Sequence, residues 1–253
     1  MHRKLVFVFF IFLGFFYSCK TEKKDSLRIA VASNLQFVIP ELVEAFSAKT
    51  GLSCEVIIGS SGKLTAQIVE GAPFDLLLSA DMKYPDELYN KGFAVDMPDV
   101  YAYGGLILWT VKDGIIPDLD SLDSKEVAYI AMGNPKTAPY GVAAKQVLMN
   151  KGIFDDLSDK IVYGESISQT NQFIISQAAE LGFTSKSVVL SNQIFAKGQW
   201  KEIDRGLYDP MAQAMVVLKN RTKYRAKALA FKDFILSAEG KEILHKFGYN
   251  VKG

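Results

Sequence analysis

Polar side chains that can donate hydrogen bonds stand at four points where a strand-like run passes into a helix-like one. Two of these turns lie early in the chain, at Ser33-Asn34 and at Ser60-Ser61, and two lie in the middle, at 134–141 and 168–171. The first N–H groups of a helix have no partner within the helix, and the helix dipole is positive at this end. Each turn therefore offers donors to an anion.

A single turn of this kind is most simply a helix cap, because Ser and Asn side chains accept hydrogen bonds from first-turn N–H groups. Four such turns, two in each half of the chain, favour one shared site for a small oxyanion. The turns supply donors and contain no obligatory carboxylate acceptor. A fully deprotonated oxyanion suits such a site better than one that carries a proton.

The strands and helices that position these turns alternate along the chain. The expected strands cover 27–32, 53–59, 74–79, 127–132, 161–163 and 183–190. The later helices are expected at 142–150, 172–181 and 224–247. The alternation predicts an α/β protein with doubly wound sheets, in which ligands bind beyond the carboxyl ends of the strands.

Two apolar runs, at 101–111 and 209–218, are longer than a typical strand. Runs of this length suit segments that cross between two lobes, and Gly104-Gly105 interrupts the first one. We therefore expect a clamshell with lobe 1 from 27–103 and 212–253 and lobe 2 from 104–211. Each lobe is expected to be a mixed sheet flanked by helices.

The N-terminus has the pattern of an exported protein. Arg3 and Lys4 precede an apolar run, which predicts a signal peptide at 1–18. Cys19 follows directly, and its surroundings resemble the lipobox of bacterial lipoproteins, so lipidation at Cys19 and an anchoring linker at 19–26 are expected. Cleavage without lipid and an uncleaved anchor remain alternatives. Lipidation would leave Cys54 as the only thiol of the mature chain.

The charge balance argues against nucleic acid as a partner. The 29 basic side chains fall to 27 when Arg3 and Lys4 leave with the signal, against 28 acidic ones. This near-neutral balance also argues against a polybasic membrane surface, so we expect membrane contact through the lipid anchor alone.

The residues for catalysis are largely missing. Apart from His2 in the signal, His245 is the only histidine, and it stands among charged residues. Neither a His-Glu-x-x-His nor a Cys-x-x-Cys string is present. The string 59–63 looks like a phosphate loop, but Leu64 follows where that loop has Ser or Thr. We therefore expect that the protein is not an enzyme, that it uses no cofactor, and that none of its residues binds a metal ion directly.

Several strings resemble those of the periplasmic molybdate-binding proteins of ABC importers, which are type II solute-binding proteins. They occur in the family's order at 32–34, 59–64, 71–76, 79–81, 134–141 and 208–218. The string Asn-Pro-x-x-Ala-Pro-Tyr-Gly at 134–141 is the most specific of them. The likeness runs from about Leu27 to the C-terminus.

The resemblance implies the two-lobed periplasmic-binding-protein fold and a molybdate or tungstate ligand, captured without catalysis. It implies a monomer of the periplasm or cell envelope that serves an ABC permease and its ATPase. The implied ligand contacts are the Ser33 hydroxyl, the Asn34 N–H, Ser61, and the backbone N–H groups of Tyr140 and Thr170. Some members add a tyrosine hydroxyl at a position that Ser185 occupies here.

Two other classes of function remain open. A binder of sulfate, phosphate or an organic anion on the same fold is the nearer alternative. Phosphate would normally need a carboxylate acceptor, for which Asp75 and Asp81 are the nearest candidates. An enzyme on this fold, or a sensor lipoprotein without transport, is the more distant alternative.

Overall fold

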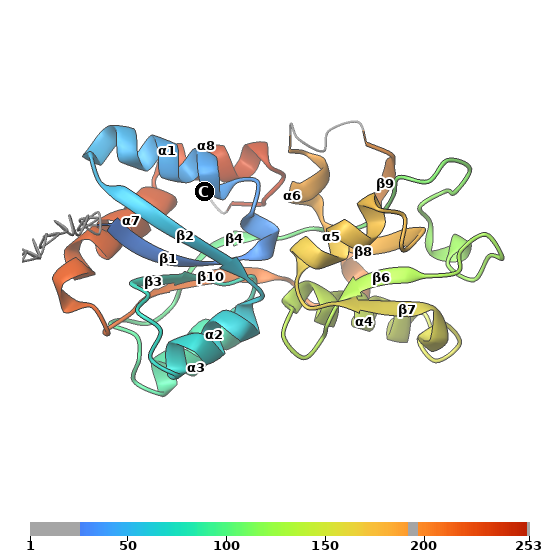
Figure 1. Cartoon of the computed structure of the whole chain (residues 1–253), viewed down its shortest axis with the longest axis horizontal. Coiled ribbons are helices and arrows are strands. Elements are labelled where there is room, and N and C mark those ends of the chain that lie inside the picture. The colour runs from blue at the N-terminus through green and yellow to red at the C-terminus, as the bar shows by residue number, and fades with distance from the viewer. Residues whose placement is uncertain (1–25, 192–196, 252–253) are drawn as a thin grey trace, which may run out of the picture.

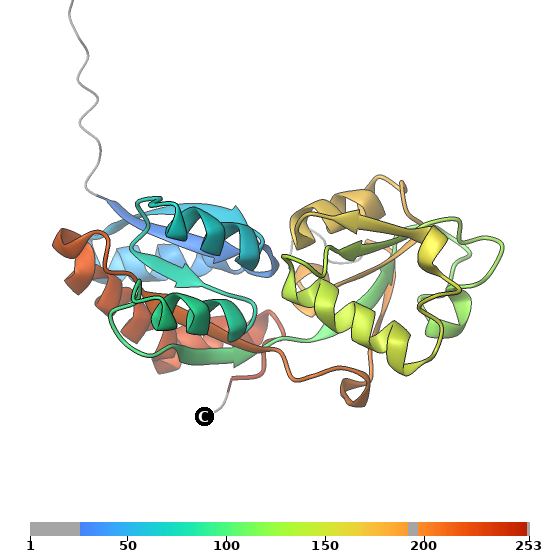
Figure 2. The same cartoon turned by 90° about the horizontal axis from the view of Figure 1, so that it is seen from below.

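Strands and helices alternate along the chain and assemble into two α/β lobes that lie side by side (Figures 1 and 2). The computed structural model describes residues 26–191 and 197–251. The expected signal peptide and Cys19 lie outside the described residues. Each lobe is built on one five-stranded mixed sheet flanked by helices, which confirms the predicted fold class.

The sheet of lobe 1 has three parallel strands followed by two that alternate in direction. In spatial order the strands are β2 (Ser53–Gly59), β1 (Ser26–Ala32), β3 (Leu76–Leu78), β10 (Ala212–Val217) and β4 (Asp99–Tyr103). The helices are η1 (Ser33–Leu35), α1 (Ile39–Thr50), α2 (Ser61–Val69), α3 (Lys83–Asn90), η5 (Thr222–Tyr224), α7 (Arg225–Leu236) and α8 (Ala238–Lys246).

The two faces of this sheet are covered by different helices, as Figure 1 shows. Leu27, Ile29 and Val31 of β1 pack on α1, α7 and α8, whereas Ala30 packs on α2 and α3. This alternation follows from the two-residue period of a strand. Because both faces are covered, β1 is apolar on both sides, as parallel strands usually are.

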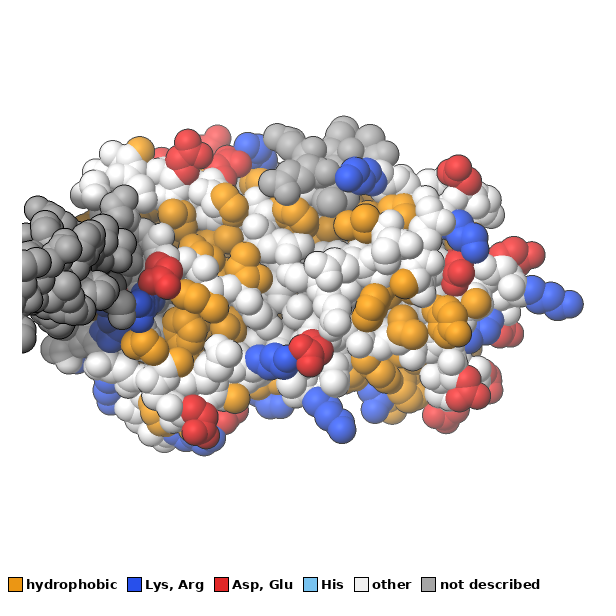
Figure 3. All heavy atoms as spheres, viewed as in Figure 1, with side chains coloured by type: hydrophobic (Ala, Val, Ile, Leu, Met, Phe, Trp, Pro, Cys, Tyr) orange, Lys and Arg blue, Asp and Glu red, His pale blue; other side chains and the backbone are white. Residues whose placement is uncertain are grey.

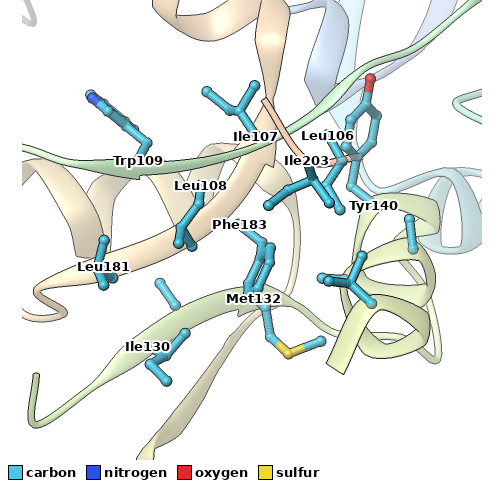
Figure 4. Close-up of a cluster of buried hydrophobic side chains, with 14 of the residues drawn as sticks. Leu106, Ile107, Leu108, Trp109, Ile130, Met132, Tyr140, Leu181, Phe183 and Ile203 are labelled. Atoms are coloured by element: carbon cyan, nitrogen blue, oxygen red, sulfur yellow. The ribbon is translucent and has the colours of Figure 1, made fainter. Parts of the chain in front are cut away.

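The sheet of lobe 2 has the same mixed character. In spatial order its strands are β7 (Ile161–Gly164), β6 (Ile130–Gly133), β8 (Leu181–Ser185), β5 (Leu106–Thr110) and β9 (Gln199–Glu202). Its helices are η2 (Leu119–Ser121), α4 (Pro139–Asn150), η3 (Ser158–Lys160), α5 (Ile167–Ile175), α6 (Lys186–Val189) and η4 (Arg205–Leu207). Figure 4 shows side chains of β5, β6 and β8 meeting in its core.

The chain crosses between the lobes at Gly104-Gly105, between β4 and β5, and returns through 203–211 into β10. A side chain at Gly104 would overlap Tyr140 Oη and Gln213 Nε2, so any other residue here would force these two groups to move. The C-terminal segment lies against the first crossing, because Tyr103 and Asn250 exchange backbone hydrogen bonds of 2.8 and 3.0 Å.

One helix begins earlier than its sequence pattern indicated. The helix expected at 172–181 is α5, which spans Ile167–Ile175. Ser166 stands before it in extended conformation, and its hydroxyl accepts a hydrogen bond from Gln169 N (3.4 Å). The polar string 168–171, which was expected to be a turn, therefore lies inside the helix.

Serine caps also divide two longer segments. The strand expected at 183–190 is β8 followed by α6, because Ser185 ends the strand and its hydroxyl caps the helix. The single helix expected at 224–247 is broken at Ser237, which is extended and accepts a hydrogen bond from Gly240 N (3.3 Å) to begin α8. Across the two described ranges, we find no helix with the length and apolarity that a membrane crossing requires.

Candidate functional site

A small cavity lies between the lobes, where β1 and β2 end and α4 and α5 begin. It is lined by Ala32, Ser33, Asn34, Ser60, Ser61, Ala80, Ala138, Pro139, Tyr140 and Ile167. Its volume of about 10 Å³, measured as the space open to the centre of a water-sized sphere, is far smaller than the roughly 300–1,000 Å³ of pockets for drug-sized ligands. The lining contains neither a carboxylate nor a basic side chain, so a charged ligand here would be held by dipoles and hydroxyls.

The first turn, at Ser33-Asn34, offers backbone N–H groups to the cavity, because its side chains are bonded within the protein. Ser33 Oγ donates a hydrogen bond to Gly59 O (2.8 Å), so the hydroxyl that was expected to reach the ligand is engaged in this structure. Asn34 Nδ2 donates to Gln213 Oε1 and to Tyr249 Oη, both at 2.9 Å. The first N–H groups of η1, which lack helical partners, remain for a ligand.

The second turn places two adjacent serines at the cavity. Ser61 is the first residue of α2, and its Oγ accepts a hydrogen bond from Ala80 N (3.0 Å). Because the oxygen accepts this bond, the hydroxyl proton of Ser61 is left to donate to a ligand. Ser60 precedes the helix and is buried, and its Oγ has no partner among the described residues.

The two turns of lobe 2 bring helix N-termini to the same cavity. In α4 the first residue is Pro139, which has no N–H, so Tyr140 carries the first free donor of that helix. In α5 the first residue is Ile167, which lines the cavity. Helix N-termini from both lobes therefore surround one small space.

Thr170 does not take part in this arrangement. Its N–H and its Oγ1 both donate to Ser166 O, at 2.9 and 3.0 Å, and it is not among the lining residues. The structure thus brings Ser33, Asn34, Ser61 and Tyr140 together and puts Ile167 where Thr170 was expected. Ser166 and Gln169 form the Ser-x-x-Gln pattern of a capping box, which is the signal that could have located this helix start.

Behind the cavity, the side chain of Gln213 bonds to groups from both lobes. Its Oε1 accepts hydrogen bonds from Asn34 Nδ2 (2.9 Å) and Tyr101 Oη (3.1 Å) in lobe 1. Its Nε2 donates to Tyr140 Oη (3.1 Å) in lobe 2. Figure 4 shows this hydroxyl directed away from the apolar core of lobe 2. Gln213 was not predicted as a site residue, because no local pattern marks it.

A second set of bonds reaches the carbonyl oxygen of Asn34. This oxygen accepts from Ser187 Oγ (2.7 Å) in lobe 2 and from Tyr249 Oη (2.9 Å) near the C-terminus. Burial raises the pKa of Tyr249 to about 12 and that of Tyr140 well above its usual value, so both hydroxyls stay neutral at physiological pH. Ser185 donates to Tyr140 Oη (3.1 Å) and does not line the cavity.

Contacts at the rim also join the lobes, which meet along a continuous seam in Figure 3. One is a backbone hydrogen bond from Gly62 N to Thr137 O (3.0 Å). The others pair Tyr84 Oη with Lys136 O (3.2 Å), Lys63 with Glu165, and Ser168 with Gln36. The structure is therefore the closed form of a clamshell.

Two lobes that close on a small, donor-lined cavity define a protein of the solute-binding class. The comparison with known sequences agrees: this chain belongs to the bacterial extracellular solute-binding protein family, whose pattern matches residues 27–250. The family that the sequence strings indicated is thereby confirmed.

Individual relatives are similar along most of their length. The molybdate-binding protein ModA of Rhodobacter capsulatus is 35% identical over 221 residues, which cover 87% of this chain and 86% of that protein. ModA of Azotobacter vinelandii is 33% identical over 228 residues, or 89% and 90% of the two chains. The solved periplasmic molybdate-binding protein of A. vinelandii matches with a TM-score of 0.85 at 32% identity, covering 90% of this chain and 100% of that one.

Proposed function

We propose that this protein captures molybdate in the interlobe cavity, binds tungstate in the same way, and delivers the anion to an ABC permease without catalysing a reaction. The observation that carries the proposal is the lining of the cavity: hydroxyls and helix N-termini from both lobes, with no titratable carboxylate. The similarity to proteins named as molybdate-binding supports the choice of anion.

The proposed contacts to the anion follow from the groups that are not already engaged. They are the N–H groups of η1 at Ser33 and Asn34, the hydroxyl of Ser61, and the N–H groups of Tyr140 and Ile167. Ile167 replaces Thr170 in this set, because the Thr170 N–H is bonded within α5. Oriented dipoles of this kind need no rearrangement when the anion arrives.

Sulfate and phosphate fit the cavity less well. Donors that are held in place by two packed lobes cannot move inward to contact a smaller tetrahedral anion. Sulfate would therefore leave some of these donors without a hydrogen bond. A protonated phosphate needs an acceptor, but Asp75 is bonded to Arg28 N and Arg221, and Asp81 to Ser79 Oγ. Neither carboxylate lines the cavity.

The first test is a melting experiment on the mature domain with a panel of oxyanions. At about 100 times the dissociation constant, a ligand stabilises the folded state by about 2.7 kcal/mol. For a protein of this size that is a shift of roughly 5–10 °C. We expect molybdate and tungstate to produce it and sulfate and phosphate at the same concentration not to. Equal shifts with sulfate would contradict the size argument.

The second test removes one backbone donor. Ile167→Pro deletes the N–H at the first position of α5, where proline is favourable, and the extended Ser166 (φ −152°, ψ 166°) suits a residue before proline. Loss of a hydrogen bond to a charged group costs about 1.5–3 kcal/mol. We therefore expect calorimetric titration to show that Ile167→Pro binds molybdate roughly ten- to hundredfold more weakly than wild type.

Ile167→Ala is the matched control for this variant, since it shortens the side chain but keeps the N–H. Both Ile167→Ala and Thr170→Val should bind molybdate within a few-fold of wild type. If Ile167→Pro binds as tightly as Ile167→Ala, the backbone N–H of Ile167 is not a ligand contact.

The third test concerns lobe closure. A Cβ at Gly62 would lie 3.0 Å from Cα and O of Thr137, which belong to the opposite lobe, and 2.7 Å from Tyr84 Oη of its own lobe, which is bonded to Lys136 O across the rim. When the lobes open, the Tyr84 side chain loses its bond to Lys136 and can move away, so overpacking of about 1–3 kcal/mol would fall chiefly on the closed form. Gly62→Ala should therefore weaken molybdate binding roughly ten- to hundredfold. The unliganded domain should unfold at the same temperature or higher, because Ala favours a helix over Gly.

Lys63→Ala is the comparison for the Gly62 variant. The Lys63–Glu165 pair is exposed at the rim, and exposed ion pairs contribute about 0–1 kcal/mol, so this variant should lose no more than about fivefold in affinity. X-ray scattering with saturating molybdate completes the test. A fully closed Gly62→Ala protein with unchanged affinity would show that this contact does not control closure.

The fourth test concerns localisation. We propose that Cys19 carries the lipid that holds the protein at the membrane, on the basis of the lipobox-like sequence. Cys19→Ser should then move the protein from the membrane fraction to the soluble fraction of its host, because acyl chains provide the anchoring free energy. Cys54→Ser is the control and should stay at the membrane. An unmodified mass for the wild-type N-terminal peptide would contradict the proposal.

A further inference from the structure

The hydroxyl of Ser60 differs from every other polar side chain that lines the cavity. The side chains of Ser33, Asn34, Ser61 and Tyr140 all have hydrogen-bond partners within the protein. Ser60 is 3% exposed, and none of the described residues provides a partner for its Oγ. Buried hydroxyls are nearly always satisfied, so this one requires an explanation.

Its position in the chain makes the missing partner more informative. Ser60 is the N-cap of α2, with extended backbone at φ −71° and ψ 148°. A serine at this position usually accepts a hydrogen bond from an N–H of the first turn, but here no such bond forms. The hydroxyl therefore neither caps its own helix nor bonds to a neighbour, and the residue lines the cavity.

We infer that Ser60 Oγ donates a hydrogen bond to the bound oxyanion, so that Ser60 and Ser61 hold it with two adjacent hydroxyls. This inference rests on the proposed function. A deprotonated tetrahedral oxyanion is an acceptor on every side, so it satisfies a hydroxyl that the protein leaves unpaired. Ser61 is oriented by its bond from Ala80 N, whereas Ser60 has no such bond and turns to meet the ligand.

The difference between the two serines has a consequence for selectivity. A hydroxyl that is fixed in place discriminates by size, and one that rotates adapts to anions of slightly different size. Ser60 should therefore add affinity for molybdate and tungstate alike. Its removal should not improve the binding of sulfate relative to molybdate.

The same helix offers a matched control. Thr65 lies one turn beyond Ser61 in α2, is also 3% exposed, and has an Oγ1 without a partner, but it does not line the cavity. Ser60→Ala and Thr65→Val each remove one unpaired buried hydroxyl. Neither variant should lower the melting temperature of the ligand-free domain, because no hydrogen bond within the protein is lost.

Calorimetric titration with sodium molybdate separates the two variants. We expect Ser60→Ala to lose affinity by about ten- to hundredfold, as for a hydrogen bond to an anion, and Thr65→Val to stay within about twofold of wild type. Ser61→Ala is measured beside them and should also lose affinity. The same three variants are then titrated with tungstate and sulfate.

The outcomes distinguish this inference from the proposed function. If wild type binds molybdate and Ser61→Ala weakens it, but Ser60→Ala binds like wild type, the Ser60 assignment is overturned while the proposed function stands. If Ser60→Ala and Thr65→Val weaken binding equally, the effect belongs to the packing of α2, and the assignment is again overturned. If wild type binds neither molybdate nor tungstate, the proposed function fails and the assignment fails with it.

Discussion

The geometry of the cavity depends on the hydrogen bonds of the Gln213 side-chain amide. It accepts from Asn34 and Tyr101 in lobe 1 and donates to Tyr140 in lobe 2, and it lies at the start of the strand that follows the second crossing. An amide has both donors and acceptors, so one side chain can tie together groups of both kinds. Because Asn34 and Tyr140 line the cavity and their N–H groups are the proposed donors, the bonds that hold the hinge would also set the spacing of donors across the site.

The helix N-termini at the cavity explain how an anion site can be free of basic side chains. A Lys or Arg beside the anion would form an ion pair that has to be broken for release, and a buried ion is costly when its partner leaves. Here the positive ends of α2, α4 and α5 would offset the charge of the proposed anion without an ion pair. The cavity is thus suited to a ligand that must be held and then given up intact.

The alternation of strands, helices and turns was sufficient to predict two sheets joined by two crossings, since those signals are local. Three of the four turns were predictable for the same reason, but the donors within them were not. The partner of Ser33 is Gly59, 26 residues away, and that of Asn34 is Gln213, 179 residues away, and no local pattern reveals such pairings. The late start expected for the helix at 172–181 was a different kind of error, because the capping pattern of Ser166 and Gln169 was present in the sequence.

The strength of capture depends on how the closing contacts are divided between the rim and the hinge. The apparent affinity of a clamshell is its intrinsic affinity multiplied by the fraction that is closed. The exposed Lys63–Glu165 pair adds about 0–1 kcal/mol and is weakened by salt. Each buried bond near the hinge, such as Ser187 Oγ to Asn34 O, contributes about 0.5–1.5 kcal/mol and is shielded from salt. Closure is therefore governed chiefly by the network behind the cavity, and the exposed ion pair at the rim can vary without loss of the site.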